Sequence, residues 1–183
     1  MGIRVAKLDP ITRADLCALL IDELKLEDLV DKRRAKQYDT GFKSATKTAE
    51  TIEKSVPRDI VGHWAEGWIQ RVLNLQIAGL KLQADGNFHP ADAVTRKDLA
   101  QVLQEALVLV TGETGLRSRY VGVESRFPDV RDDVYYYNAA ALVVDRGLMQ
   151  TDGLAGEFRP GEEVSGADAV LGIKRLQSGL AVR

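Results

Sequence analysis

Three stretches of the chain carry apolar residues at i, i+3 and i+4, which is the spacing of an amphipathic helix. Each stretch follows a proline and then a Thr or Ser, and the third stretch is thinner and is interrupted by Gly172. The three stripes are Leu16, Leu19, Leu20 and Leu24; Leu99, Val102, Leu103, Ala106, Leu107 and Val110; and Val170, Ile173, Leu176 and Leu180. The pattern predicts three helices that each bury one face.

Two further apolar stripes precede the second and third of these helices. They consist of Trp64, Trp68, Ile69, Val72, Leu73 and Ile77, and of Tyr136, Ala139, Ala140, Val143 and Val144. Glycine often follows the last turn of a helix, so we expect these helices to end at Gly79 and near Gly147. Trp64 and Trp68 are four residues apart and are expected on one helix face, where either ring packs in the core or Trp64 faces a ligand.

A Thr or Ser followed three residues later by Asp marks the start of the three proline-preceded helices. The pairs are Thr12 and Asp15, Thr95 and Asp98, and Ser165 and Asp168. The hydroxyl can accept a hydrogen bond from the backbone of the third helical residue, while the carboxylate accepts one from the backbone of the cap. Each pair therefore predicts a capping box.

The order of these features repeats: an extended stretch with a proline, a helix, a loop with glycine and an aromatic residue, and a capped helix. We expect an all-α fold of one compact domain. Its predicted parts are 1–27, the second half of unit 1; 28–55, a charged linker or helix extension; 56–110, unit 2; 111–126, a loop; and 127–183, a degenerate unit 3. A half-unit cannot bury its apolar face alone, so each unit needs its neighbours.

The segment 28–55 is polar and contains Lys32-Arg33-Arg34-Ala35-Lys36. It is interpreted as a solvated helix extension and linker, with a polyanion-binding patch as the alternative. The missing first half of unit 1 leaves open that another copy of the chain supplies it, so a homo-oligomer is a further expectation.

Composition narrows the function classes. The chain has 183 residues, of which 45% are hydrophobic and 28% charged, and its net charge of −2 argues against generic nucleic-acid binding. No apolar run approaches the roughly 18 to 20 residues that span a membrane. No signal peptide is recognised, so we expect either a cytosolic protein or a piece of a longer precursor. Cys17 has no partner for a disulfide, and His63 and His89 do not form a metal cluster, so no cofactor is expected.

Enzyme motifs are not found. Thr111-Gly112-Glu113-Thr114-Gly115 lacks the lysine of a phosphate-binding loop, and Asp85-Gly86-Asn87 lacks the acidic series of a calcium-binding EF-hand. The sequence therefore predicts a non-catalytic chain, unless it is an accessory domain of a larger secreted enzyme.

Arg13 and Arg96 each follow the capping threonine directly. A cation at the first helical position opposes the positive end of the helix dipole, so local helix stability does not explain either residue. An anion bound by the guanidinium and by free backbone N–H groups would explain both. The alternatives are an ion pair with a neighbouring carboxylate, or a solvated side chain.

Three motifs in unit 2 carry a family resemblance. Asp59-Ile60-Val61-Gly62-His63-Trp64-Ala65 is followed by Asp85-Gly86-Asn87-Phe88-His89-Pro90 and then by Val94-Thr95-Arg96-Lys97-Asp98. In this order they resemble the opening, loop and helix box of the S-layer homology module of bacterial cell envelopes. Ile11-Thr12-Arg13-Ala14-Asp15 resembles the same box. Unit 3 departs from it, with Tyr135-Tyr136-Tyr137 in place of His-Trp-Ala and Ser165-Gly166 in place of Thr-Arg.

The resemblance implies repeated units in a pseudo-threefold helical bundle that anchors proteins to the bacterial surface by binding cell-wall polysaccharide. The ligand would be an acidic, often pyruvylated, polymer held in grooves between units. The resemblance implies a site made of Arg96, Thr95, Trp64, Arg13, Thr12, Asp98 and Asp15. The alternative is a structural or self-association module of the envelope that has lost sugar binding.

Overall fold

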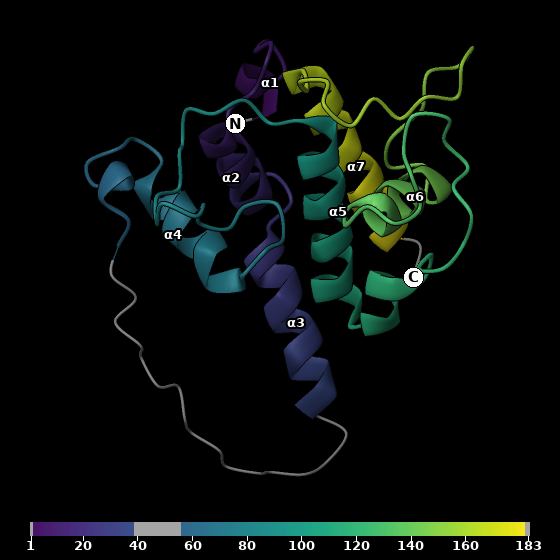
Figure 1. Cartoon of the computed structure of the whole chain (residues 1–183). Coiled ribbons are helices and arrows are strands. Elements are labelled where there is room, and N and C mark those ends of the chain that lie inside the picture. The colour runs from purple at the N-terminus through teal and green to yellow at the C-terminus, as the bar shows by residue number, and fades with distance from the viewer. Residues whose placement is uncertain (1, 39–55, 182–183) are drawn as a thin grey trace.

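The computed structural model describes residues 2–38 and 56–181 (Figure 1). These residues form an all-α fold, and the only extended pairings among them are two isolated bridges. The helices are α1 (Gly2–Val5), α2 (Arg13–Asp22), α3 (Leu26–Tyr38), α4 (Glu66–Leu75), α5 (Arg96–Thr111), α6 (Tyr137–Asp145) and α7 (Gly166–Ala181), with 3-10 helices η1 (Arg58–Ile60) and η2 (Thr114–Ser118).

A closed ring of backbone hydrogen bonds joins one residue from each predicted unit. The N–H of Ile11 donates to the carbonyl of Val164 at 3.0 Å, and the N–H of Val164 donates to that of Val94 at 2.9 Å. The N–H of Val94 closes the ring on the carbonyl of Ile11 at 3.0 Å. All three residues are buried, so water cannot pair with their backbone groups. Each of these groups therefore depends on another unit for its hydrogen bond.

A second set of bonds between units lies at the helix starts. The first N–H groups of an α-helix have no partner inside the helix. Here the N–H of Arg13 donates to the carbonyl of Asp92 at 2.9 Å, and that of Arg96 to the carbonyl of Glu162 at 2.9 Å. The N–H of Gly166 donates to the carbonyl of Leu8 at 2.8 Å. The first N–H groups of α2 and α5 are therefore paired with the loop of the following unit, and that of α7 is paired with the N-terminal segment.

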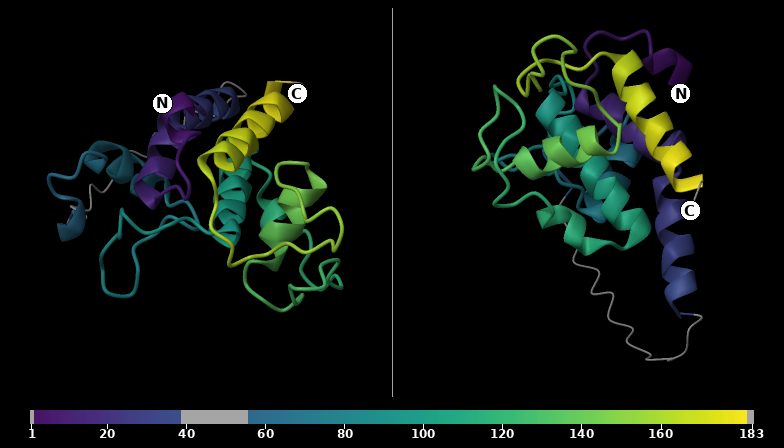
Figure 2. Two further views of the ribbon diagram at one scale, coloured as in Figure 1. Left: turned by 90° about the horizontal axis from the view of Figure 1, so that it is seen from above. Right: turned by 90° about the vertical axis from the view of Figure 1, so that its right-hand side faces the viewer.

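Helix α5 lies at the centre of the helices, and its partners are α3, α6, α7 and η2 (Figure 2). Helix α2 packs against α4 on one side of the molecule, and α6 and α7 lie on the other. One continuous core of buried apolar side chains runs from Val5 to Leu176. The apolar stripes of the sequence supply most of it, because their spacing places them on the inner face of each helix.

Units 2 and 3 close their loops in the same way. The carboxylate of Asp59 accepts hydrogen bonds from the N–H groups of Phe88 and His89, the latter at 2.6 Å. The carboxylate of Asp129 accepts from the N–H groups of Phe158, at 2.8 Å, and Arg159. Because both aromatic rings are fully buried, each Asp fixes a loop whose ring enters the core.

Helix α4 differs from its predicted limits. It begins at Glu66, so Trp64 precedes the helix and does not share a helix face with Trp68. It ends at Leu75 because Gln76 adopts the left-handed conformation, and the prediction that Gly79 ends it is wrong. Gly79 instead permits a close approach, since a Cβ there would lie 2.8 Å from the carbonyl oxygen of Asp98.

Two segments outside the repeat contain helices. Residues 28–38 of the predicted charged segment belong to α3, where Leu26 and Val30 are buried, and residues 39–55 lie outside the described part of the chain. The predicted loop 111–126 contains η2, which packs against α5 and α6. No helix within residues 2–38 and 56–181 is long and apolar enough to cross a membrane.

Gly166 has a steric reason for replacing the arginine of the other two boxes. A Cβ at this position would lie 1.7 Å from the carbonyl oxygen of Val5 and 3.1 Å from that of Leu8. The N-terminal segment therefore occupies the space that a side chain would need, and only glycine fits.

We expect Gly166→Ala to lower the free energy of unfolding by about 3 kcal/mol, because the new methyl group overlaps a main-chain carbonyl of another unit. Urea denaturation would measure the change. Gly161→Ala is the matched control, since nothing lies within 4 Å of its Cβ position, and its stability should stay within about 0.5 kcal/mol of the wild type. Equal stability of the two variants would contradict the packing of the N-terminal segment on α7.

Candidate functional site

The predicted capping boxes of α2 and α5 are confirmed. The hydroxyl of Thr12 accepts from the N–H of Asp15 at 3.2 Å, and the carboxylate of Asp15 accepts from the N–H of Thr12 at 3.1 Å. Thr95 and Asp98 form the second box, with 3.2 Å between the N–H of Thr95 and the carboxylate. These four side chains are thus hydrogen-bonded at the starts of the two helices.

Arg13 is buried between units 1 and 2, with 9% of its surface exposed. Its Nε, Nη1 and Nη2 donate to the carbonyl oxygens of Phe88 at 2.9 Å, Gly79 at 3.0 Å and Lys81 at 2.8 Å. The guanidinium also lies 4.6 Å from the centre of the Phe88 ring. Arg13 therefore binds the loop of unit 2 rather than a carboxylate of its own helix.

Burial lowers the pKa of Arg13, while the nearby Cys17 and the carboxylates of Asp98, Asp92 and Asp59 act in the opposite direction. The guanidinium remains charged at any ordinary pH because its unperturbed pKa is very high. The three carbonyl oxygens supply the negative ends of dipoles that a buried cation requires.

Arg96 makes the equivalent contacts to unit 3 but is only half-buried. Its Nε donates to the carbonyl of Phe158 at 2.7 Å and its Nη2 to the carbonyl of Gln150 at 2.6 Å. The guanidinium lies 5.2 Å from the centre of the Phe158 ring. Within the described residues its Nη1 has no hydrogen bond, so the outer part of Arg96 can still donate to a ligand.

The expectation of free backbone N–H groups at these helix starts is wrong. The N–H groups of Arg13 and Arg96 donate to the neighbouring unit, and those of Ala14 and Lys97 donate to the carbonyls of Pro90 and Pro160 at 3.0 and 3.1 Å. Any anion bound here must be held by side chains, because the backbone donors are already used.

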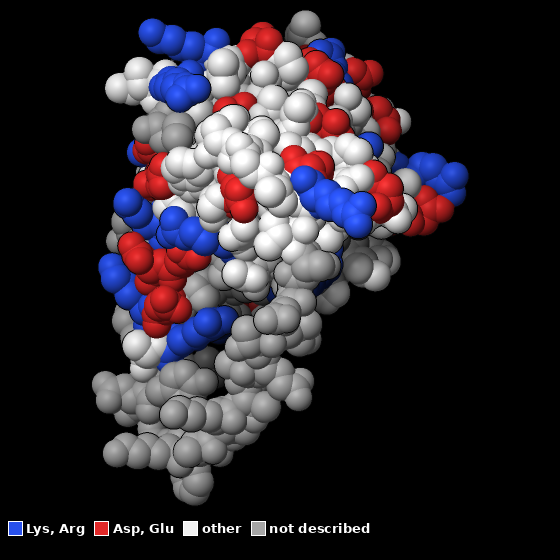
Figure 3. All heavy atoms as spheres, turned by 90° about the vertical axis from the view of Figure 1, so that its left-hand side faces the viewer, with Lys and Arg blue, Asp and Glu red and all other residues white. Residues whose placement is uncertain are grey.

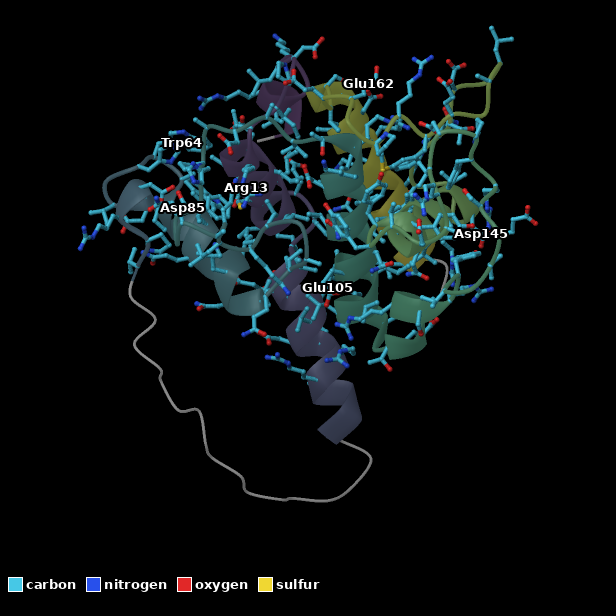
Figure 4. All side chains as sticks on the ribbon, viewed as in Figure 1. Arg13, Trp64, Asp85, Glu105, Asp145 and Glu162 are labelled. Carbon is cyan, nitrogen blue, oxygen red and sulfur yellow. The ribbon has the colours of Figure 1, made fainter. Side chains whose placement is uncertain are left out.

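A hollow of about 120 Å³ lies beside Arg96, between the start of α5, the loop before α7, and α7 itself. Its lining residues are Arg96, Leu99, Leu148, Met149, Gln150, Glu162, Glu163, Val164, Asp168, Leu171 and Arg175. Figure 4 shows Glu162 near α7, far from Trp64. We call this the Arg96 hollow.

Arg175 is the cation of the Arg96 hollow that sequence reasoning missed. It is half-buried, and among the described residues its guanidinium has no hydrogen bond or ion pair. Asp168, Leu171 and Arg175 follow the i, i+3, i+7 spacing of one helix face, which was the only available signal. This spacing predicts that the three residues share one face of α7, but it does not predict that Arg96 lies opposite that face.

Trp64 lies on the α4 side of the molecule, as its label in Figure 4 shows. Its side chain is 48% exposed, its ring centre is 5.9 Å from that of Trp68, and the Arg4 guanidinium lies 6.0 Å from it. Figure 3 shows a broad uncharged area on this face of the molecule. Trp64 is thus an exposed aromatic surface separate from the Arg96 hollow.

Helix caps align the third unit differently from the sequence. Ala65 is the N-cap of α4 and Tyr136 is the N-cap of α6, so Tyr135 occupies the position of Trp64. The alignment from the sequence, which matched Tyr135 with His63, is therefore wrong by one residue. Of the three tyrosines, Tyr135 is 74% exposed and Tyr137 is 1% exposed. Tyr135 therefore lies at the surface and Tyr137 in the core.

Other reactive groups give no site. Cys17 is buried, and burial raises the pKa of its thiol far above the ordinary value. Hydrogen bonds from the backbone and side chain of Asn87, followed by the contact with His89, lower the pKa of Asp85 to about 2. No group of three His, Cys, Asp or Glu that could hold a metal occurs among the residues that the structure describes.

The family comparison places an S-layer homology domain at residues 126–170. The matched residues run from the start of unit 3 through α6 and into α7, so the model recognises the unit that the sequence analysis regarded as degenerate. No curated protein and no solved structure matches the chain. S-layer homology domains are anchoring modules, so the match indicates cell-wall anchoring in general.

We expect Arg13→Ala to lower the free energy of unfolding by about 3 kcal/mol, because three carbonyl oxygens in a buried site lose their donors. Arg96→Ala should cost about 1 kcal/mol, since water can reach the carbonyls that it leaves. Urea denaturation of both variants tests this order. Arg131→Ala, which removes an exposed cation, should stay within about 0.5 kcal/mol of the wild type, and a larger loss for Arg96→Ala than for Arg13→Ala would contradict the assignment.

Proposed function

We propose that this chain is a non-catalytic module that holds a protein at the bacterial cell surface by binding an acidic polysaccharide of the cell wall. The observation that carries the proposal is the S-layer homology domain at residues 126–170. The paired loops of Asp59 and Asp129 support it, because unit 2 repeats the internal hydrogen bonds of the matched unit.

The proposal includes a pseudo-threefold arrangement of the three units. The ring of Ile11, Val94 and Val164 supports it, since each residue plays the same donor and acceptor role toward the next. The helix starts support it too, because all three donate to the following unit. In such an arrangement the boundaries between units are equivalent in position but differ in the side chains that line them.

The Arg96 hollow is the proposed site for the acidic substituent of the sugar. Arg96 keeps an unused donor and Arg175 has no partner among the described residues, so two guanidinium groups can face one carboxylate. Glu162, Glu163 and Asp168 also line the hollow. Because these three carboxylates outnumber the two arginines, an acid group can bind only where it contacts the guanidinium groups directly.

The other predicted site residues take different roles in this proposal. Arg13 fixes the boundary between units 1 and 2 through its three carbonyl contacts and is a positioning residue. Thr12, Asp15, Thr95 and Asp98 fix the helix starts that carry the two arginines. Trp64 offers an exposed ring on which a further part of the polymer can stack.

The second candidate function is a structural or self-association module of the envelope without sugar binding. The observation that favours it is that the residues directly after the capping Thr or Ser are not equally available to a ligand. Arg13 is buried against carbonyl oxygens, and Gly166 has no side chain, so only Arg96 has a donor open to solvent.

Co-sedimentation with purified bacterial wall polymer separates the two candidates. We expect the wild type to sediment with the polymer, and Arg175→Gln to weaken binding by about tenfold, because one charge-assisted contact is lost without loss of an internal bond. Arg96→Ala should weaken binding at least as much. Arg58→Gln, which removes an exposed cation of η1, is the matched control and should bind as the wild type does.

Two results would go against the proposal in different ways. Unchanged polymer binding by both arginine variants would contradict the Arg96 hollow as the binding site, but it would not contradict the anchoring function. Failure of the wild type to bind any wall polymer would remove sugar binding and favour the structural module. Circular dichroism spectra that match the wild type are the condition for interpreting each variant.

A further inference from the structure

The segment 112–126 is fixed against the start of α6 by buried hydrogen bonds. The amide oxygen of Asn138 accepts from the N–H of Tyr120 at 2.8 Å, and the amide nitrogen donates to the carbonyl of Leu116 at 2.9 Å. The hydroxyl of Tyr137 donates to the carbonyl of Glu124 at 2.9 Å. Because these bonds hold the segment at both ends, its position relative to α6 is preorganised.

A hollow of about 460 Å³ lies between this segment and the residues that lead into α6. Its lining residues are Arg117, Val121, Gly122, Asp132, Asp133, Val134, Tyr135, Tyr137 and Asn138. We call it the Tyr135 hollow. Arg117, Val121 and Gly122 come from the segment 112–126, which lies outside the stretches that resemble the family motifs. The other lining residues belong to the matched residues 126–170, so the hollow forms where this segment meets unit 3.

The aromatic wall of the hollow is open to a ligand. Tyr135 is 74% exposed, and its ring meets that of Tyr136 edge-on, with 5.1 Å between the ring centres. The contact with Tyr136 orients the Tyr135 ring, and most of the Tyr135 surface remains accessible. An exposed aromatic face beside hydrogen-bonding groups is the arrangement that binds the apolar face of a sugar ring.

The Tyr135 hollow differs from the Arg96 hollow in that, among the described residues, the arginine that lines it is paired with a carboxylate. Arg117 is paired with Glu105, whose side chain is mostly buried, and Asp133 is paired with Arg131. Asp132 has no hydrogen bond or ion pair within the described residues, which leaves the hollow with a negative excess. A carboxylate-bearing sugar would be repelled, whereas sugar hydroxyl groups can donate to the two aspartates.

We propose that the Tyr135 hollow is a second carbohydrate site, specific for sugar units that carry no acidic group. Tyr135 stacks on the sugar ring, and Asp132 and Asp133 accept hydrogen bonds from its hydroxyl groups. As a wall-binding site it rests on the proposed function, but recognition of a neutral oligosaccharide does not depend on the Arg96 hollow. Unit 3 would then bind sugar by a different means from the arginine that Gly166 replaces.

The test is a titration followed by amide chemical shifts in NMR spectra, with chitotetraose, cellotetraose and neutral fragments of wall glycan as probes. At least one probe should shift the amides of Gly122, Asp132 and Tyr135. Tyr135→Ala should weaken that binding by about tenfold, because the stacking surface is lost. Tyr135→Phe keeps the ring and should bind within about threefold of the wild type, and an oligogalacturonate should bind at least tenfold more weakly than the neutral probe.

Three outcomes would overturn the site: no shifts at these amides with all three probes, equal binding by Tyr135→Ala and the wild type, or preference for the acidic oligomer. The Arg175→Gln variant separates this site from the proposed function. Loss of polymer binding in that variant with unchanged neutral-sugar shifts supports both sites. Neutral-sugar shifts in a wild type that does not sediment with wall polymer would support the Tyr135 hollow and reject anchoring through the Arg96 hollow.

Discussion

The fold depends on the ring of three main-chain hydrogen bonds between Ile11, Val94 and Val164. A buried backbone group without a partner costs roughly 1 to 3 kcal/mol, and each residue of the ring has its partners only in other units. No unit can therefore complete its core alone. The capped helices must start at this ring, which explains why a proline, an aliphatic residue and a capping residue recur in the same order.

The two box arginines extend this constraint to the side chains. Arg13 and Arg96 each bind the carbonyl of the phenylalanine in the next unit, so each connects a helix start to a neighbouring loop. A cation that opposes its own helix dipole is stabilised by carbonyl dipoles from elsewhere in the chain. Anion binding at these positions is thus limited to what the internal contacts leave exposed, which is much more for Arg96 than for Arg13.

The three boundaries between units have become chemically different. The boundary at Arg13 is closed, the one at Arg96 keeps a polar hollow, and the one at Gly166 is filled by the N-terminal segment. Of these three boundaries, only the one at Arg96 has a box arginine with a donor that is open to solvent. The segment 112–126 adds a second hollow where it meets unit 3, whose box carries no arginine.

The sequence by itself determined the amphipathic helices and the boxes at Thr12 and Thr95, because these depend on contacts within a few residues. It could not place the limits of α4, since Gln76 adopts a left-handed conformation that no local motif requires. It identified Arg13 and Arg96 as unexplained cations but not their partners. Only the tertiary structure decided which carbonyl groups pair with the two arginines, because these carbonyls come from loops more than 50 residues away in the chain. For the same reason only the tertiary structure showed the Arg96 hollow and its second arginine, Arg175.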